Sequence, residues 1–179
     1  TTVNVDVAGE LAAEQVEVLG LAALRGMFSA ITDEPATFVN VGQMAEQRGV
    51  TYSVETRSES KSYRSTVTVT AVTADGSSTN VTGTLSGLEK VQKIVRINER
   101  GFDMRAEGQN LFVHYSDRPG VLGRVGSILG GEGIDIQAAA LSQDASGEGA
   151  SLILRVDRAV AEPTVDRIIS ELSATATQI

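Results

Sequence analysis

The hydrophobic pattern of residues 109–179 constrains the fold most, because its period changes in a fixed order along the chain. Residues 110–115, 134–142 and 150–157 are rich in strand-forming side chains. Two helical stripes accompany them: Val121, Leu122, Val125, Ile128 and Leu129 in the first, and Val165, Ile168, Ile169 and Leu172 in the second. With a final strand over residues 175–179, the order βαββαβ predicts a ferredoxin-like domain whose helices cover one face of the sheet.

Residues 1–108 predict a separate domain that is mainly an antiparallel sheet, so the chain as a whole is α+β. Val3, Val5 and Val7 alternate with polar residues, as in a half-buried strand. The other expected elements are helices at 16–31 and 41–48, strands at 52–56, 65–73, 79–85, 92–98 and 102–106, and turns around 74–77 and 99–101. The short polar junction at 105–110 predicts two closely coupled domains, 1–108 and 109–179.

Composition excludes several classes of function. The 179 residues carry a net charge of −8, so we expect no nucleic-acid partner and no anionic-membrane partner. There is no cysteine and only one histidine, His114, which excludes thiolate chemistry and multi-histidine metal sites, so no metal is expected. No apolar run is long enough to span a membrane. The sequence begins with Thr1 inside a predicted strand, so we expect a segment of a longer, cytoplasmic protein.

A basic cluster stands out from this acidic background and predicts an anion site. Five of the 15 cationic residues lie within one short stretch: Lys90, Lys93, Arg96, Arg100 and Arg105. If the turn lies at residues 99–100, three of these cations converge on one dianion, with charge-assisted hydrogen bonds of about 1.5–3 kcal/mol each. Arg155 adds a cation inside an apolar strand. The alternative is a solvated strand pair whose cations form salt bridges with nearby carboxylates, namely Glu89, Glu99, Asp103 and Glu107. For Arg155 the alternative partner is Asp157 or Asp135.

A second candidate site is the loop of residues 115–120, between the first strand and first helix of the C-terminal domain. The N–H groups at the start of the helix can hold a carboxylate, and Asp117 can accept hydrogen bonds from an ammonium group. Together these groups match the two charged halves of an α-amino acid. The alternative is a helix start that is capped by these acceptor side chains.

Other motifs carry less information. Gly120, Gly123 and Gly126 lack the spacing of a dinucleotide-binding loop. The GXXG run at 123–126 lacks the basic groove of a nucleic-acid-binding KH domain. A lone histidine on a strand, His114, is interpreted as structural. We therefore expect no catalytic machinery in this chain.

The segment 110–123, which contains Asp117-Arg118-Pro119-Gly120-Val121-Leu122-Gly123, resembles together with residues 133–139 an ACT domain of the kind that closes D-3-phosphoglycerate dehydrogenases. Residues 9–12, 24–30, 83–87 and 92–105 resemble the additional regulatory domain of the long-form, actinobacterial-type enzymes. The resemblance covers essentially the whole chain and leaves out the nucleotide-binding and substrate domains.

The resemblance implies the regulatory region of an enzyme that oxidises 3-phosphoglycerate with NAD in L-serine biosynthesis. It implies that the ACT domain self-associates as a dimer or tetramer and binds L-serine at the dimer interface through Tyr115, Asp117 and Asp135. It also implies that the preceding domain binds the substrate or another dianion through Lys93, Arg100, Arg105 and Arg155. NAD would bind the catalytic part of the parent enzyme, and no cofactor is expected in this chain.

Two positions depart from the family pattern. Asp135 stands where the family usually has asparagine, and an ionised carboxylate cannot donate a hydrogen bond to the carboxylate of an amino acid. Gly101 stands where close relatives carry a histidine beside the anion site. We therefore expect weakened or altered L-serine binding and a weaker anion site, or one with a different pH response.

Two alternative functions keep the same domains. Iron–sulfur L-serine dehydratases carry similar regulatory domains, with the cysteines on the catalytic part. A free-standing amino-acid sensor that regulates a partner protein is the more distant alternative.

Overall fold

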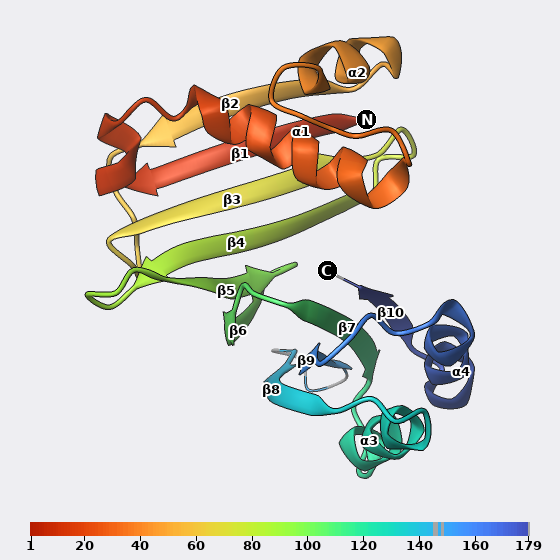
Figure 1. The fold of residues 1–179 in the computed structure, drawn as a ribbon. Helices are drawn as coiled ribbons and strands as arrows, with labels where there is room; N and C mark the ends of the chain where they lie inside the picture. The colour runs from red at the N-terminus through yellow and green to blue at the C-terminus, as the bar shows by residue number, and fades with distance from the viewer. Residues whose placement is uncertain (145–146, 148, 179) are drawn as a thin grey trace. The chain divides into compact units, whose positions relative to one another are not determined.

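The computed structural model describes residues 1–144, 147 and 149–178, and the chain forms two compact units, residues 1–99 and residues 100–179 (Figure 1). Each unit is a sheet with helices, which confirms the α+β class predicted from the sequence. Among the described residues, no helix combines the length and apolar character needed to cross a membrane.

The first unit is built on five strands in the order β2-β1-β3-β4-β5. β1 and β2 are parallel, while β3, β4 and β5 continue the sheet with antiparallel pairing. The crossover between β1 and β2 carries the helices of the unit. The elements are β1 (Thr2–Gly9), the 3₁₀ helix η1 (Glu10–Ala13), α1 (Glu17–Ile31), α2 (Val41–Gln47), β2 (Thr51–Arg57), β3 (Ser65–Val72), β4 (Ser78–Ser86) and β5 (Val91–Ile97).

The core of the first unit lies between α1 and the sheet, where Figure 1 shows α1 running across β1 and β2. The alternating valines of β1 are all buried, and Val3 packs in one cluster with Leu24 and Phe28 of α1. Asn4 and Asp6 lie on the other face, which is only partly buried. The period-2 pattern of β1 and the period-3.6 pattern of α1 thus meet at a single apolar layer.

The chain leaves β5 through a tight turn at Asn98 and Glu99, whose φ angles are 45° and 68°. Positive φ at two consecutive residues is typical of a two-residue hairpin turn. Asn98 binds Asn80 of β4 twice, accepting from its backbone N–H at 2.8 Å and donating to its carbonyl oxygen at 3.0 Å. The turn residues are therefore 98 and 99, whereas the predicted convergence of three cations assumed a turn at residues 99–100.

The second unit has the predicted βαββαβ order, which is confirmed by a four-stranded antiparallel sheet, β10-β7-β9-β8. The two helices cover one face and bury Val125, Ile128 and Ile168 against Leu111, Val113 and Leu154. The elements are β6 (Arg100–Arg105), β7 (Gln109–Ser116), α3 (Val121–Gly131), β8 (Ile136–Gln143), β9 (Gly149–Val156), α4 (Glu162–Leu172) and β10 (Thr175–Gln178).

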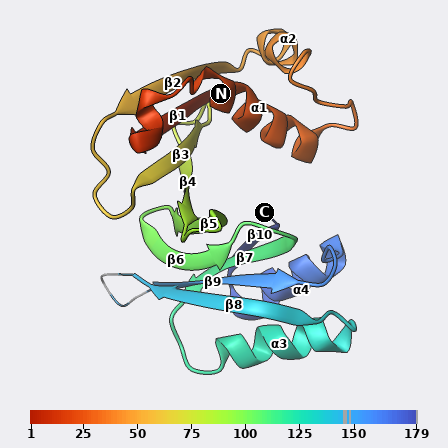
Figure 2. The same cartoon turned by 60° about the vertical axis from the view of Figure 1, so that its left-hand side comes forward.

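β6 belongs to the second unit and lies on the side of β8 away from α3 (Figure 2). Phe102 of β6 meets Phe112 of β7 edge to face, with ring centroids 6.2 Å apart. Phe102, Met104, Phe112 and Ile153 are all buried. The first unit ends at Glu99 and the second begins at Arg100, whereas the polarity of residues 105–110 predicted a domain boundary at residue 108. The apolar side chains of β6 account for this difference.

Gly9 ends β1 in a backbone conformation that an L side chain rarely adopts, with φ 88° and ψ −152°. A Cβ atom at this position would overlap the carbonyl oxygen of Arg64, which already accepts the backbone N–H of Glu10 at 3.1 Å. We therefore expect Gly9→Ala to lower the free energy of unfolding by about 2–4 kcal/mol, from strain and overlap together.

The matched control is Gly49→Ala. Gly49 also has positive φ, 64°, but has open space where a Cβ would stand. Its expected cost is the conformational strain alone, about 1 kcal/mol. Urea unfolding followed by circular dichroism measures both variants, and equal losses would contradict the role assigned to the Arg64 contact.

Candidate ligand-binding sites

The first candidate site surrounds the loop between β7 and α3. Tyr115 is buried beneath the helices, and burial, followed by the nearby charge of Asp117, raises the pKa of its hydroxyl. The carboxylate of Asp117 accepts a 2.6 Å hydrogen bond from Nε2 of Gln143, at the end of β8. Arg118 donates from Nη2 to the carbonyl oxygen of Leu172 at 3.0 Å, which anchors the loop to the end of α4.

The start of α3 has N–H groups that no side chain caps within the described residues. Gly120 precedes the helix with φ 91°, and its carbonyl oxygen accepts the N–H of Arg124 at 2.9 Å. The sequence left open whether an acceptor side chain of the 115–120 loop caps this helix, and none does so here among the described residues. Uncapped N–H groups at a helix start can bind an anionic group such as a carboxylate.

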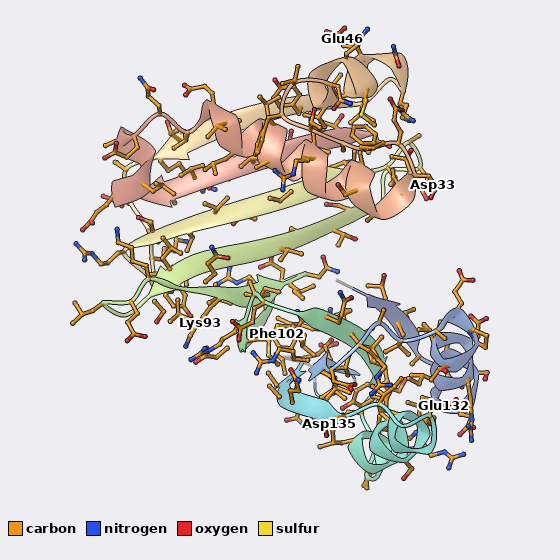
Figure 3. All side chains as sticks on the ribbon, viewed as in Figure 1. Asp33, Glu46, Lys93, Phe102, Glu132 and Asp135 are labelled. Carbon is orange, nitrogen blue, oxygen red and sulfur yellow. The ribbon has the colours of Figure 1, made fainter. Side chains whose placement is uncertain are left out.

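Asp135 lies at the other end of the sheet, just before β8 (Figure 3). Its backbone N–H donates to Oδ1 of Asp157 at 3.0 Å, and its carbonyl oxygen accepts the N–H of Asp157 at 3.1 Å. Asp135 directly precedes β8, and Gln143, the partner of Asp117, is the last residue of this strand, eight positions further along the chain. This separation is about 25 Å at the usual strand rise. One copy of the chain therefore does not bring Asp135 to Asp117.

β8 is an edge strand that pairs only with β9 in the sheet as described. Its residues alternate between half-buried and exposed, and Leu141 is 50% exposed. Leu122 at the start of α3 is 46% exposed. A long edge strand with apolar side chains is a surface on which another strand can pair.

The second candidate site holds two of the predicted cations. Arg155 lies in β9 between Leu154 and Val156 of the core, and Nη1 of its guanidinium contacts Oε1 of Glu107. Arg105 at the end of β6 approaches the same oxygen, with its Nη1 3.7 Å away. Arg155 is thus paired with Glu107, whereas the sequence offered Asp157 or Asp135 as alternatives.

Arg155 and its cross-strand neighbour Asn110 each keep a polar atom without a partner. The Nε atom of Arg155 and the Oδ1 atom of Asn110 are buried and make no hydrogen bond with any described group. Buried polar groups in proteins are nearly always hydrogen-bonded. This point of the sheet therefore holds one buried donor and one buried acceptor that no described group satisfies.

Arg100 pairs with a different carboxylate. Its Nε and Nη2 atoms donate to Oδ1 and Oδ2 of Asp144 at 2.5 and 3.0 Å. This fork lowers the pKa of Asp144, with a further lowering from the nearby His114. Asp144 is hydrogen-bonded to Gly149, six residues along β9 from Arg155 and so about 20 Å away.

Lys93 lies in β5 of the first unit, where it is half-buried (Figure 3). Gly101, where relatives carry histidine, is exposed in β6. His114 has Nδ1 3.0 Å from the carbonyl oxygen of Ala150 and 3.1 Å from Oγ of Ser151, contacts that hold the ring on the sheet.

Sequence reasoning named Glu107 among the carboxylates available to the basic cluster, but it did not assign Glu107 to Arg155 or Asp144 to Arg100. Gln143, the partner of Asp117, was missed as well. Glu107 lies two positions after Arg105, so its pairing with this cation could be expected, whereas its contact with Arg155, 48 residues away, left no local signal.

Comparisons with known proteins agree on the two domains. The model of the D-3-phosphoglycerate dehydrogenase intervening domain matches residues 1–98, and that of the ACT domain matches residues 110–172. D-3-phosphoglycerate dehydrogenase from Mycobacterium leprae (strain TN) is 49% identical over 173 residues, 97% of this chain and 33% of the relative. The same enzyme from Mycobacterium bovis is 52% identical over the same shares, and that from Bacillus subtilis is 30% identical over 92% of this chain and 30% of its own length. The chain thus spans about a third of the length of these curated relatives.

The Arg100–Asp144 pair predicts a pH dependence of stability. The folded-state pKa of Asp144 is lowered, so its contribution is present above the unfolded value of about 3.9 and is lost as pH falls through the folded value. We expect Asp144→Asn to lower the urea midpoint at pH 7 and to differ less from wild type at pH 3. The control is Asp166→Asn on the exposed face of α4. A gap between Asp144→Asn and wild type that stays constant from pH 7 to pH 3 would contradict this assignment.

Proposed function

Because this chain belongs to the D-3-phosphoglycerate dehydrogenase family that carries an intervening domain and an ACT domain, we propose that it regulates such an enzyme by binding two kinds of ligand. The ACT domain binds L-serine as the feedback effector of L-serine biosynthesis. Arg105 and Arg155, the two predicted cations that approach the same oxygen of Glu107, bind the phosphorylated substrate or another dianion.

The positions of the candidate residues at the two ends of β8 support the effector proposal. Tyr115 and Asp117 lie at one end of this edge strand and Asp135 at the other, so the three residues form one site only when two chains combine. Antiparallel pairing of β8 with β8 of a second copy brings the Asp135 end of one strand to the Asp117 end of the other. A two-fold dimer of this kind has two equivalent sites.

Each half of an amino acid has a partner in such a site. The uncapped N–H groups of α3 donate to the carboxylate, and Asp117 accepts hydrogen bonds from the ammonium group. Gln143 holds one oxygen of Asp117, which keeps the carboxylate oriented. Arg118 keeps the loop against α4.

The closeness of Arg105 and Arg155 and a buried donor without a partner support the anion proposal. Arg155 is 20% exposed and keeps a buried Nε donor without a partner, and Arg105 lies close to the same carboxylate oxygen. A phosphate offers several oxygens to a guanidinium fork, where a carboxylate offers two.

Hydride transfer belongs to the part of the relatives that this chain does not span. β7 is antiparallel to both of its neighbours, and the glycines at the start of α3 lack the spacing of a dinucleotide-binding loop, so this helix start does not fit the pyrophosphate of NAD. The enzyme proposed here uses NAD on its catalytic domains. Each regulatory ligand then acts by binding one arrangement of the paired chains more tightly, with a typical coupling of about 1–3 kcal/mol.

Asp135 predicts weak effector binding. Its carboxylate cannot donate to the ligand and repels the ligand's own carboxylate, so we expect Asp135→Asn to bind L-serine about tenfold more tightly than wild type, or about 1.4 kcal/mol. Isothermal titration calorimetry measures both proteins, and Asp117→Ala should abolish binding in either background. Tight L-serine binding by the wild type, unchanged in Asp135→Asn, would contradict the role of Asp135.

Sedimentation velocity on the same samples tests the two-chain site. L-serine should bind the dimer or tetramer and shift the equilibrium towards it. A protein that has the mass of one chain at high concentration and still binds L-serine would overturn the shared site.

The anion site predicts a separate ligand response. Sulfate, tartrate and 3-phosphoglycerate should raise the melting temperature of the wild type in a thermal-shift assay, because a ligand that binds only the folded chain stabilises it. Arg105→Ala should remove most of this shift, since Arg105 is more than half exposed and contributes charge without supporting the core. Asp117→Ala is the control that should leave the shift intact. Equal shifts in wild type and Arg105→Ala would rule out this location.

A further inference from the structure

Arg105 and Arg155 already face a carboxylate of the chain itself. Oε1 of Glu107 contacts Nη1 of Arg155 and lies 3.7 Å from Nη1 of Arg105. A single oxygen of Glu107 therefore lies at the point where the two guanidinium groups come closest. An anion that bound both arginines would need the same point.

The backbone of Glu107 is held in place by the sheet of the ACT domain. Nδ2 of Asn110 donates to the carbonyl oxygen of Glu107 at 3.2 Å. Gly108 follows with φ 70°, and the Cγ and Cδ atoms of Arg155 lie 3.7 and 3.6 Å from where its Cβ would stand. The position of the residue is thus built into the fold, and its carboxylate does not reach Arg155 by chance.

The side chain of Glu107, in contrast, is free to leave. It is 55% exposed, whereas Arg155 is only 20% exposed. Rotation of the Glu107 side chain towards solvent needs no movement of the core. Arg155 cannot follow it, because the stem of Arg155 lies against Gly108 and its neighbours in β9 are in the core.

Glu107 also satisfies the site incompletely. A guanidinium has five N–H donors, and the buried Nε of Arg155 has no partner while Glu107 is in place. A dianion with three or four oxygens can reach more of these donors than one carboxylate oxygen does. Replacement of Glu107 by such a ligand therefore adds hydrogen bonds to Arg155, whereas replacement by a simple carboxylate adds few.

We propose that Glu107 is a resident competitor, a carboxylate that occupies the anion site of Arg105 and Arg155 and must be displaced before a phosphorylated or sulfated ligand binds. This inference rests on the proposed anion-binding role of these two arginines. It adds that Glu107 lowers the affinity of the site for every anion by the same factor, because each anion must first displace this carboxylate.

The test compares sulfate binding by calorimetry in wild type, Glu107→Gln and Asp166→Asn. Glu107→Gln keeps the shape of the side chain and removes its charge, so sulfate should bind about fivefold more tightly, the effect of losing a partly exposed ion pair. Asp166→Asn removes the same unit of charge from the exposed face of α4 and should change the affinity by less than about 1.5-fold, because distant charges are screened in 0.15 M salt. Acetate binding should rise by the same factor as sulfate binding in Glu107→Gln.

Arg105→Ala separates failure of this inference from failure of the anion site. If Arg105→Ala loses sulfate and Glu107→Gln binds it no better than wild type, the competitor role is wrong and the anion site stands. If neither wild type nor Glu107→Gln binds sulfate, both are wrong. An equal gain in Asp166→Asn and Glu107→Gln would also overturn the inference, since it would reduce the effect to net charge. Unfolding temperatures of all four proteins show that each is folded.

Discussion

The strand β9 is buried on both of its faces, and most features of the second unit follow from this constraint. Helices α3 and α4 cover Leu152 and Leu154, while Ile153 faces the side on which β6 lies. A charged side chain in such a strand must find a partner, because an unpaired buried charge costs several kcal/mol. Arg155 is the cation in this position, and Glu107 from the junction before β7 supplies the opposite charge.

The same sheet leaves one long edge open. β8 carries an exposed leucine and has no partner on its outer side within the described chain. The residues proposed to bind the effector, Asp117 and Asp135, lie at the two ends of this edge, so the proposed effector site and the proposed assembly are one feature. Under this proposal, ligand binding and assembly are coupled because the ligand contacts residues of both chains.

The local patterns of the sequence predicted most of the fold, but few of the contacts between charged groups. The valines of β1 and most of the α3 stripe are local signals that were placed on the buried face, whereas Leu122, expected in the same stripe, is 46% exposed. The parallel pairing of β1 with β2 left no such signal, because parallel and antiparallel strands share the same alternation. Asp117, Asp135 and the four cations could be named only through the resemblance and the charge pattern.

The sequence by itself determined the order of the elements and the face that each buries, because periodicity and turn residues act within a few positions of the chain. Only the tertiary structure decided which charges meet. Glu107 reaches Arg155 across 48 residues and Arg100 reaches Asp144 across 44, and several other carboxylates were equally available in the sequence. The distance between Asp117 and Asp135 was likewise decided by the fold, since it is the length of one strand at the edge of the sheet.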